Sequence, residues 1–296
     1  MGASQVKPYL SVCAIYRDEA DYLAEWIEFH LLVGVERFFL YDNMSVDHHR
    51  EVLQPYIEQD IAIVHDWPDH PKGQFSAYTD CLERYRHDVR WIAFIDLDEF
   101  LFSPTGRPVS DVLIEYESAP GVGVNWAMFG TSGHRTKPEG LVIETHEWRM
   151  EDIPVDCPIK TIVDPTRTVS PGATVHFFSH ADGPPPVNEN HEPIDQLPRS
   201  SSRTLSYSKL RINHYLMKSE EEYRRKRARG RADADRSEPS IPDDVFRRRE
   251  KAFNQHHDTT IQMYLPRLRE ALAARAQAVS PAGSQQAEAR SVRTST

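Results

Sequence analysis

The chain has 296 residues, of which 39% are hydrophobic and 10% aromatic, a composition typical of a globular protein with room for one large α/β domain and an extension. Its net charge is -10, and its three cysteines form no Cys-x-x-Cys pair, which argues against a disulfide framework and a thiolate zinc site. No apolar run approaches the roughly 18 residues of a membrane helix, so we expect a cytoplasmic protein.

The charge is unevenly distributed along the chain. Residues 1–217 hold 18 Lys and Arg against 33 Asp and Glu, whereas residues 218–296 hold 17 against 12. An acidic body argues against nucleic acid as the main partner, because phosphate binding requires clustered cations. Together with the helical pattern near the end, this predicts a main domain at 1–217, a basic helical extension at 218–280 and a disordered tail at 281–296.

Strand and helix patterns alternate through the first part of the chain. The predicted strands are residues 9–16, 35–41 and 61–65. The predicted helices are residues 20–33, a segment that begins after the polar turn at 42–47, and residues 74–87. This alternation is typical of a parallel sheet with right-handed crossovers, and ligands bind such sheets beyond the carboxyl ends of the strands.

An acidic cluster follows the next strand, in the sequence WIAFIDLDEFLF at residues 91–102. Its first five residues predict a strand buried on both faces, and unpaired carboxylates are costly in an interior, so we expect the carboxylates at the strand end to face a cation. Asp96 and Asp98 lie two positions apart and can point the same way in an extended segment, toward one hard metal ion, while Glu99 turns away. The alternative is a strand that ends in a solvated acidic turn.

The pattern becomes less regular after residue 102. The predicted elements are a helix at 109–118, strands at 123–129, 141–150, 160–165, 174–178 and 210–215, a proline-rich loop or lid at 181–202, and helices at 219–236 and 242–278. The fold class expected from the whole chain is α/β, with a Rossmann-like nucleotide-binding sheet, a mixed second half and a C-terminal helical extension.

Five pieces of this sequence, in this order, resemble glycosyltransferases of the GT-A fold, particularly the family ninety-two and related family-two-like enzymes. They are YRDEADYLAEWIEFHLLVGVERFFLYDNMSVD, WIAFIDLDEFLF, NWAMFGTSGH, KTIVDP and INHYLMKS followed by a basic helix. The resemblance implies transfer of a sugar from a nucleotide-diphosphate sugar, here a UDP-sugar, to a hydroxyl of a glycan or other acceptor, with inversion and with Mn²⁺ or Mg²⁺ at the diphosphate. Asp18 departs from the family pattern, which often has Asn there.

The metal is assigned to the acidic cluster and to one distant histidine. Asp98 is the first expected ligand, Asp96 either shares the metal or accepts a hydrogen bond from the ribose, and His214 resembles the third ligand of the family. A nitrogen ligand favours manganese over magnesium. His214 could instead be a hydrogen-bonded histidine at a strand edge. Lys218 is expected at the diphosphate, and the alternative is a solvated lysine.

The remaining site residues are assigned to the nucleotide, the sugar and the base. Arg17, Asp42 and Asn43 are expected at the nucleotide, although Asp42 and Asn43 also suit a simple turn. The residues expected to line the donor or acceptor pocket are Trp126, Gly130, Ser132 and His134. Inversion requires a carboxylate base, for which we choose Glu144 from four candidates. The other three are Glu147, Asp152 and Asp156. His176 and His180 are expected to be structural.

Two other classes of function compete with catalysis. One is a nucleotide-binding module of the same fold without turnover. The other is binding of nucleic acid or an anionic surface through the basic run from Arg224 to Arg231. Because acidic residues precede that run, we expect a solvated helix that contacts a polyanion or the membrane periphery, distant from the catalytic centre.

Overall fold

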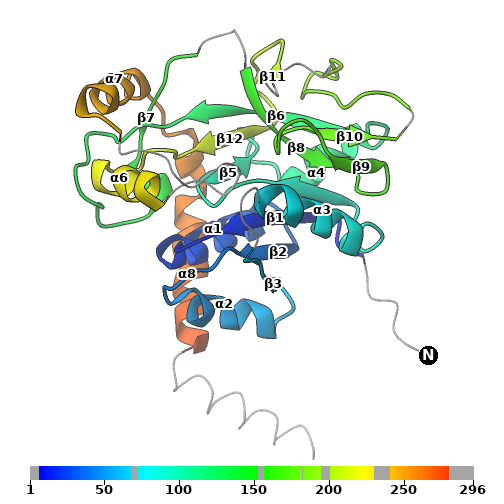
Figure 1. Ribbon diagram of the computed structural model, residues 1–296, viewed down its shortest axis with the longest axis horizontal. Helices are drawn as coiled ribbons and strands as arrows, with labels where there is room; N and C mark the ends of the chain where they lie inside the picture. Colours follow the sequence, from blue (N-terminus) through cyan, green and yellow to red (C-terminus); the bar gives the residue numbers. More distant parts are fainter. Residues whose placement is uncertain are drawn as a thin grey trace, which may run out of the picture.

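A mixed sheet with helices on both faces forms the centre of the molecule (Figure 1). The computed structural model describes residues 7–68, 73–152, 157–181, 183–194, 201–229 and 241–279. Eight strands follow the order β3-β2-β1-β4-β8-β6-β12-β5, and β11 (Ser201–Ser202) pairs with β8 beside this path. The eight are β1 (Leu10–Tyr16), β2 (Arg37–Asp42), β3 (Ala62–Asp66), β4 (Trp91–Phe94), β5 (Glu99–Phe102), β6 (Gly121–Met128), β8 (Cys157–Val163) and β12 (Arg211–His214).

The first four strands are parallel, as the alternating pattern predicts. β1 pairs in parallel with β2 and β4, and β2 pairs in parallel with β3. Side chains alternate between the two faces of a strand, so Val12 and Ala14 pack in one apolar cluster while Cys13 and Ile15 pack in the other. Burial of both faces explains why β1 reads as a continuous apolar run.

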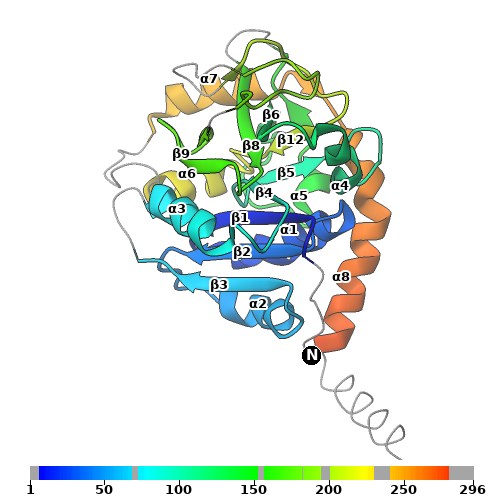
Figure 2. The same cartoon turned by 90° about the vertical axis from the view of Figure 1, so that its right-hand side faces the viewer.

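The helices cover both faces of this parallel part. The first cluster is closed by α1 (Ala20–Leu32), with α2 (His49–Glu58) and α8 (Leu265–Val279) beside it, and the second by α3 (Gly73–Tyr85). Figure 2 shows α8 running along the side of the molecule next to the first strands. Arg275 of α8 donates to Glu28 of α1 at 2.7 Å. This hydrogen bond holds α8, the last helix that the structure describes, against α1. The domain division at residue 217 stays a prediction.

The acidic strand differs from the prediction in shape. The chain turns at residues 95–98, after β4, and resumes as the separate strand β5, which pairs antiparallel with β12. Asp96 and Asp98 therefore lie in a turn, and the two-residue alternation of an extended strand does not govern their directions. Glu99 begins β5 and is completely buried.

Two of the predicted strands in the second half are wrong. Residues 141–150 form the short helix α5 (Val142–Thr145) and the two-residue strand β7 (Trp148–Arg149), because Glu25 of α1 accepts hydrogen bonds from the first amides of α5. Of the strand predicted at 174–178, only residue 178 is in a strand, as the first residue of β10 (Phe178–His180), which forms a hairpin with β9 (Thr168–Pro171).

The proline-rich segment predicted as a lid packs on the sheet where the structure describes it. Val187 exchanges two backbone hydrogen bonds with β6, accepting one from Gly123 and donating one to Gly121. Ile194 is buried against Ile159. Within residues 183–194, the chain is therefore part of the covered sheet face.

The C-terminal extension is helical but interrupted. Its elements are α6 (Glu220–Arg229), α7 (Asp243–Phe253), β13 (His256–His257), η2 (Thr260–Tyr264) and α8. The interruption at β13 arises because this strand pairs with β7. No helix among the described residues has both the length and the apolar character needed to cross a bilayer. The tail predicted at 281–296 lies outside the described residues.

Glu25 gives a testable pH dependence of stability. Burial raises its pKa from 4.5 to about 7, although the amides of Val142 and Ile143 lower it. The folded state thus holds this proton more tightly than the unfolded chain, so its contribution to stability is present at low pH and is lost as pH rises toward 7. The difference in unfolding free energy between wild type and Glu25→Gln should shift by about 2.5 kcal/mol between pH 5 and pH 8, in favour of the variant at pH 8. Urea unfolding at both pH values checks this, and a difference that does not change with pH would contradict it.

Candidate active site

Two neighbouring cavities open at the carboxyl ends of the parallel strands. The larger, of about 630 Å³, is bordered by the ends of β1 and β4, by β6 and β12, and by α6 and α7. The smaller, of about 420 Å³, lies between the start of α1 and α6. Residues common to both linings are Arg17, Glu19, Asp98, Leu216, Lys226 and Arg229. Both positions match the edge of the sheet at which ligands bind in folds of this kind.

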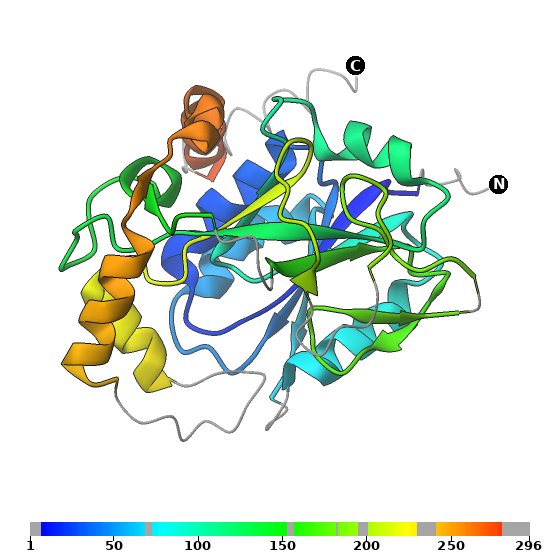
Figure 3. The ribbon, with the colours of Figure 1, turned by 90° about the horizontal axis from the view of Figure 1, so that it is seen from above.

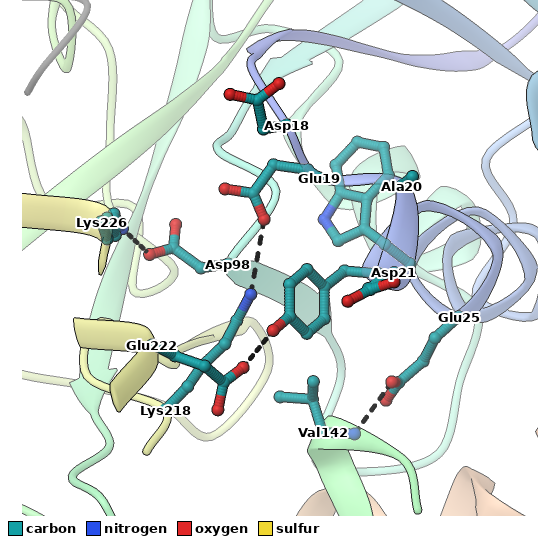
Figure 4. A network of polar contacts seen from close by, with 12 residues as sticks. Asp18, Glu19, Ala20, Asp21, Glu25, Asp98, Val142, Lys218, Glu222 and Lys226 are labelled. Carbon is teal, nitrogen blue, oxygen red and sulfur yellow. Dashed lines mark hydrogen bonds and ion pairs between the residues drawn. The ribbon is translucent and has the colours of Figure 1, made fainter. Parts of the chain in front are cut away.

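Asp98 lies at the centre of this region and is almost completely buried. Its Oδ2 is 3.4 Å from Nε2 of His214 and forms an ion pair with Nζ of Lys226. Figure 4 shows the carboxylate between α6 and the turn after β4. Burial opposes ionisation, but the charge of Lys226 and the contact with His214 outweigh it and hold the pKa of Asp98 well below its ordinary value. Asp98 is therefore a carboxylate that is already ionised and fixed in place.

His214 reaches Asp98 from a strand more than a hundred residues later. β12 pairs antiparallel with β5, and this register places His214 opposite Glu99. Its Nδ1 is 3.9 Å from Oε1 of Glu99, and neither atom has a hydrogen-bond partner among the described residues. The ring also lies against Trp126, with 4.5 Å between the centroids. Nε2 faces the Asp98 carboxylate, which places the ring to ligate an ion bound there.

Asp96 lines the same cavity as Asp98 but contacts a different cation. Its Oδ2 accepts from Nζ of Lys160 at 2.9 Å, and its Oδ1 accepts from Nε2 of Gln74 at 2.8 Å. Burial raises the pKa of Asp96, but the charge of Lys160 outweighs burial and lowers it. The two carboxylates thus have different partners, because the chain turns between them, and a metal ion shared by Asp96 and Asp98 stays a prediction.

The side chains of this site supply only part of the ligand set that a divalent metal ion needs. Among the described residues, no group of three His, Cys, Asp and Glu side chains is arranged to hold an ion. Asp98 and His214 supply two donors of the types that manganese accepts, and divalent ions at nucleotide sites commonly take their remaining ligands from phosphate and water. The donor set thus suits an ion that binds together with a diphosphate.

The residues predicted at the nucleotide are divided by the structure. Arg17, at the end of β1, lines both cavities, and Asn43, after β2, lines the larger. Asp42 accepts from the amide of Ser45 at 2.9 Å and lies 3.4 Å from Nε2 of His49, and it is absent from both linings. Asp42 therefore has the turn role that the sequence left open as its alternative.

The basic helix α6 covers the cavities, contrary to the prediction of a solvated surface helix. Lys226, Arg227 and Arg229 line the larger cavity, and Figure 3 shows α6 beside α7. Arg229 forms an ion pair of 2.6 Å with Glu19 and donates to the carbonyl of Arg17. The cations are drawn inward because the turn after β4 and the start of α1 are acidic. Arg231 lies outside the described residues.

Lys218 lies in the smaller cavity, buried and beside α1. Its Nζ is 3.0 Å from the centroid of the Tyr22 ring and 3.5 Å from Oε2 of Glu19. Its backbone adopts the left-handed conformation, with φ of 47°, which is uncommon for a lysine and is found at sites where surrounding contacts fix the chain. Burial lowers the pKa of Lys218, so its charge depends on acidic neighbours.

Of the four residues predicted to line the sugar or acceptor pocket, only Trp126 lines the larger cavity. Ser132 lies in a separate open groove beside α7, and a side chain at Gly130 would collide with Asn254. His134 contacts the carbonyl of Thr145 at 2.9 Å. The loop at 130–134 turns away from the cavity because the helix α5 and the C-terminal extension pack against it.

Glu144 also lies outside both cavities. It sits in α5 and pairs with Arg269 of α8, which explains why it cannot be placed at an acceptor in the larger cavity. Glu147 pairs with His257 at 3.2 Å and Asp152 with Arg149, and Asp156 is not among the described residues. The described carboxylates that line the larger cavity are Glu19, Asp96 and Asp98, and each contacts a cation.

Sequence reasoning missed three residues that shape this site. Lys160 is 1% exposed and lies between Asp96 and Glu99, and a lysine inside the apolar strand CPIKTIV was a readable sign of a buried acidic partner. Gln74 has no comparable signal. His176 lines the larger cavity, and its ring packs against Trp126. His180, four residues later, does not line this cavity.

The mixed sheet, with its two cavities at the carboxyl ends of the parallel strands, has the architecture of a nucleotide-binding α/β fold. The family model described as Glycosyltransferase family 92 matches residues 8–269 of the chain. The chain therefore belongs to glycosyltransferase family 92. The match continues past residue 217 and includes α6, α7 and the start of α8.

Curated relatives agree with this membership. A glycosyltransferase family 92 protein of Oryza sativa subsp. japonica is 34% identical over 145 residues, which cover 48% of this chain and 25% of the relative. The galactan beta-1,4-galactosyltransferase GALS2 of Arabidopsis thaliana is 35% identical over 104 residues, covering 32% of this chain and 20% of the relative. The chain thus spans about a quarter or less of the length of these relatives.

Solved structures resemble the chain at low identity. TarS 1–349 of S. aureus matches with a TM-score of 0.36 and 15% identity over 53% of this chain and 47% of that chain. Glucosyl-3-phosphoglycerate synthase of Mycobacterium tuberculosis, in complex with Mn²⁺, UDP and glucosyl-3-phosphoglycerate, matches with a TM-score of 0.29 and 15% identity over 40% and 44%.

Proposed function

We propose that this chain transfers a sugar from a UDP-sugar to a hydroxyl of a glycan acceptor, with inversion, using Mn²⁺ or Mg²⁺ held by Asp98 and His214. The observation that carries the proposal is the buried pair of these two side chains, 3.4 Å apart, at the border of a 630 Å³ cavity. Family membership supplies the reaction class. The galactosyltransferases among the relatives make UDP-galactose the first donor to test.

The residues of the larger cavity divide the work of holding the donor. Arg17 and Asn43 border the end where β1 and β2 finish and would contact the nucleoside. Asp96 is held by Gln74 and Lys160 in a fixed orientation and is suited to accept hydrogen bonds from a ribose. Trp126 lines the same cavity, and the sugar would lie against its ring.

Departure of the nucleoside diphosphate builds up negative charge, and a divalent ion bound with it offsets that charge. The protein's own part is to keep Asp98 ionised, which the charge of Lys226 does against the effect of burial, and to hold His214 beside Asp98, where its ring packs against Trp126. Basic side chains of α6 border the same space and add positive potential where the diphosphate would lie.

A donor screen tests this proposal. The purified protein should be stabilised against heat by UDP and Mn²⁺ together, and one UDP-sugar should be consumed in their presence while other nucleotide sugars are not. Thermal shift and release of UDP measure the two effects. Stabilisation without consumption of any donor, with glycan acceptors present, would favour the non-catalytic module, and the absence of both effects would contradict the proposal.

A further inference from the structure

Lys226 occupies the position next to Asp98 that a divalent metal ion would have to take. Its Nζ contacts Oδ2 of Asp98 (Figure 4). The same oxygen faces Nε2 of His214. The Lys226 side chain is 37% exposed, while that of Asp98 is 9% exposed, so the ammonium closes the open side of the buried carboxylate. It lines both cavities.

An ammonium and a divalent ion cannot both stay on this oxygen. Like charges at contact distance repel strongly in a partly buried site, where water screens them little. Binding of a metal at Asp98 and His214 therefore requires Lys226 to leave. A lysine can do so at small cost, since its four-carbon chain rotates freely.

The helix that carries Lys226 is fixed, so the movement is confined to the side chain. Arg229, one turn later, pairs with Glu19 and donates to the carbonyl of Arg17. Tyr223, one turn earlier, is buried against α7. Glu19 is already occupied by Arg229 and Lys218, so it offers little to an additional cation. The anion that can receive the displaced ammonium is the diphosphate of the donor.

We propose that Lys226 is a positioning residue that occupies Asp98 in the free protein and moves to the donor diphosphate when the divalent ion binds. This inference rests on the proposed function. It assigns one side chain two successive partners, and it makes metal binding and nucleotide binding favour each other. The metal alone has to displace the ammonium, whereas the metal and diphosphate together give it a new partner.

The test compares Lys226→Met with wild type in two binding measurements. Mn²⁺ titration of the nucleotide-free protein, followed by the electron paramagnetic resonance signal of free Mn²⁺, should show about tenfold tighter binding in the variant. Isothermal titration with UDP at saturating Mn²⁺ should show about tenfold weaker binding. Lys209→Met is the matched control, because Lys209 forms a 2.9 Å ion pair with Glu115 outside both cavities, and neither affinity should change.

The opposite signs make the outcomes distinct. Unchanged or weaker Mn²⁺ binding by both Lys226→Met and Lys226→Gln would overturn the occupation of Asp98, and unchanged UDP binding would overturn the transfer to the diphosphate. The two substitutions are used so that one misfolded variant, detected by thermal unfolding, leaves the other to decide. If wild type binds no UDP at any Mn²⁺ concentration, the proposed function itself fails, whereas the nucleotide-free titration still reports the competition at Asp98.

Discussion

Replacing Asp98 by asparagine should abolish sugar transfer and leave the fold intact. The substitution keeps the shape of the side chain but removes the charge that faces His214 and Lys226. A neutral amide holds a divalent ion far less well than a carboxylate, so transfer should fall by about 100- to 1,000-fold or more. Release of UDP from the donor identified by screening measures the loss, and thermal unfolding reports whether the variant is folded.

Asp60→Asn provides the matched control. Asp60 pairs with Arg37 at the other end of the sheet, its side chain is 57% exposed, and its φ of 57° is one that asparagine readily adopts. We expect this variant to retain wild-type activity. A folded Asp98→Asn protein that turns over at the wild-type rate would remove Asp98 from the reaction.

His214→Ala should weaken manganese binding by about 10- to 100-fold, or ~1.4 to 3 kcal/mol. The imidazole supplies a nitrogen ligand 3.4 Å from Asp98, and Asp98 remains in the variant to hold the ion less tightly. High Mn²⁺ should therefore restore part of the activity of His214→Ala but not of Asp98→Asn. Activity measured against Mn²⁺ concentration separates the two variants.

His134→Ala is the corresponding control. This histidine was predicted at the pocket, but its ring contacts the carbonyl of Thr145 and lies outside both cavities. Its dependence on Mn²⁺ should match that of wild type. A His214→Ala protein with an unchanged Mn²⁺ dependence would show that the histidine only packs against Trp126.

The sequence predicts the parallel half of the fold well because β1, most of β2 and β4 are buried on both faces, and amphipathic helices separate the strands. β1, β2 and β3 and the helices between them lie within a few residues of their predicted bounds. The second half is less predictable, since its short elements depend on distant partners. Glu25 accepts a hydrogen bond from the first amide of α5 and lies 117 residues before it. The strand β7 forms because β13 pairs with it.

The contacts of single site residues are equally hard to predict from the sequence, because they too depend on distant partners. Spacing alone placed Asp96 and Asp98 on one ion, but the turn after β4 directs Asp96 to Lys160, whose position 64 residues later no local pattern reveals. His214 lies at Asp98 as the family resemblance led us to expect, although its role as a ligand stays a prediction.

The prediction that the basic run in α6 forms a solvated surface helix was wrong because it considered only the residues of the run and not the residues that face it. Three acidic residues begin the helix and cations follow, which looks like a solvated helix with favourable ends. In the structure, the face that carries Lys226 and Arg229 meets Asp98 and Glu19, acidic residues from turns more than a hundred positions earlier. A basic helix after an acidic nucleotide-type domain can therefore complete its site.

A crystal structure with UDP and Mn²⁺, in which anomalous scattering locates the ion, tests both the proposed metal site at Asp98 and His214 and the movement of Lys226. We expect an anomalous peak within coordination distance of both Asp98 and His214, the diphosphate against the same ion, and the ammonium of Lys226 moved from Asp98 to the diphosphate. UDP bound in the larger cavity with no anomalous peak between Asp98 and His214, and with Lys226 still paired to Asp98, would contradict both.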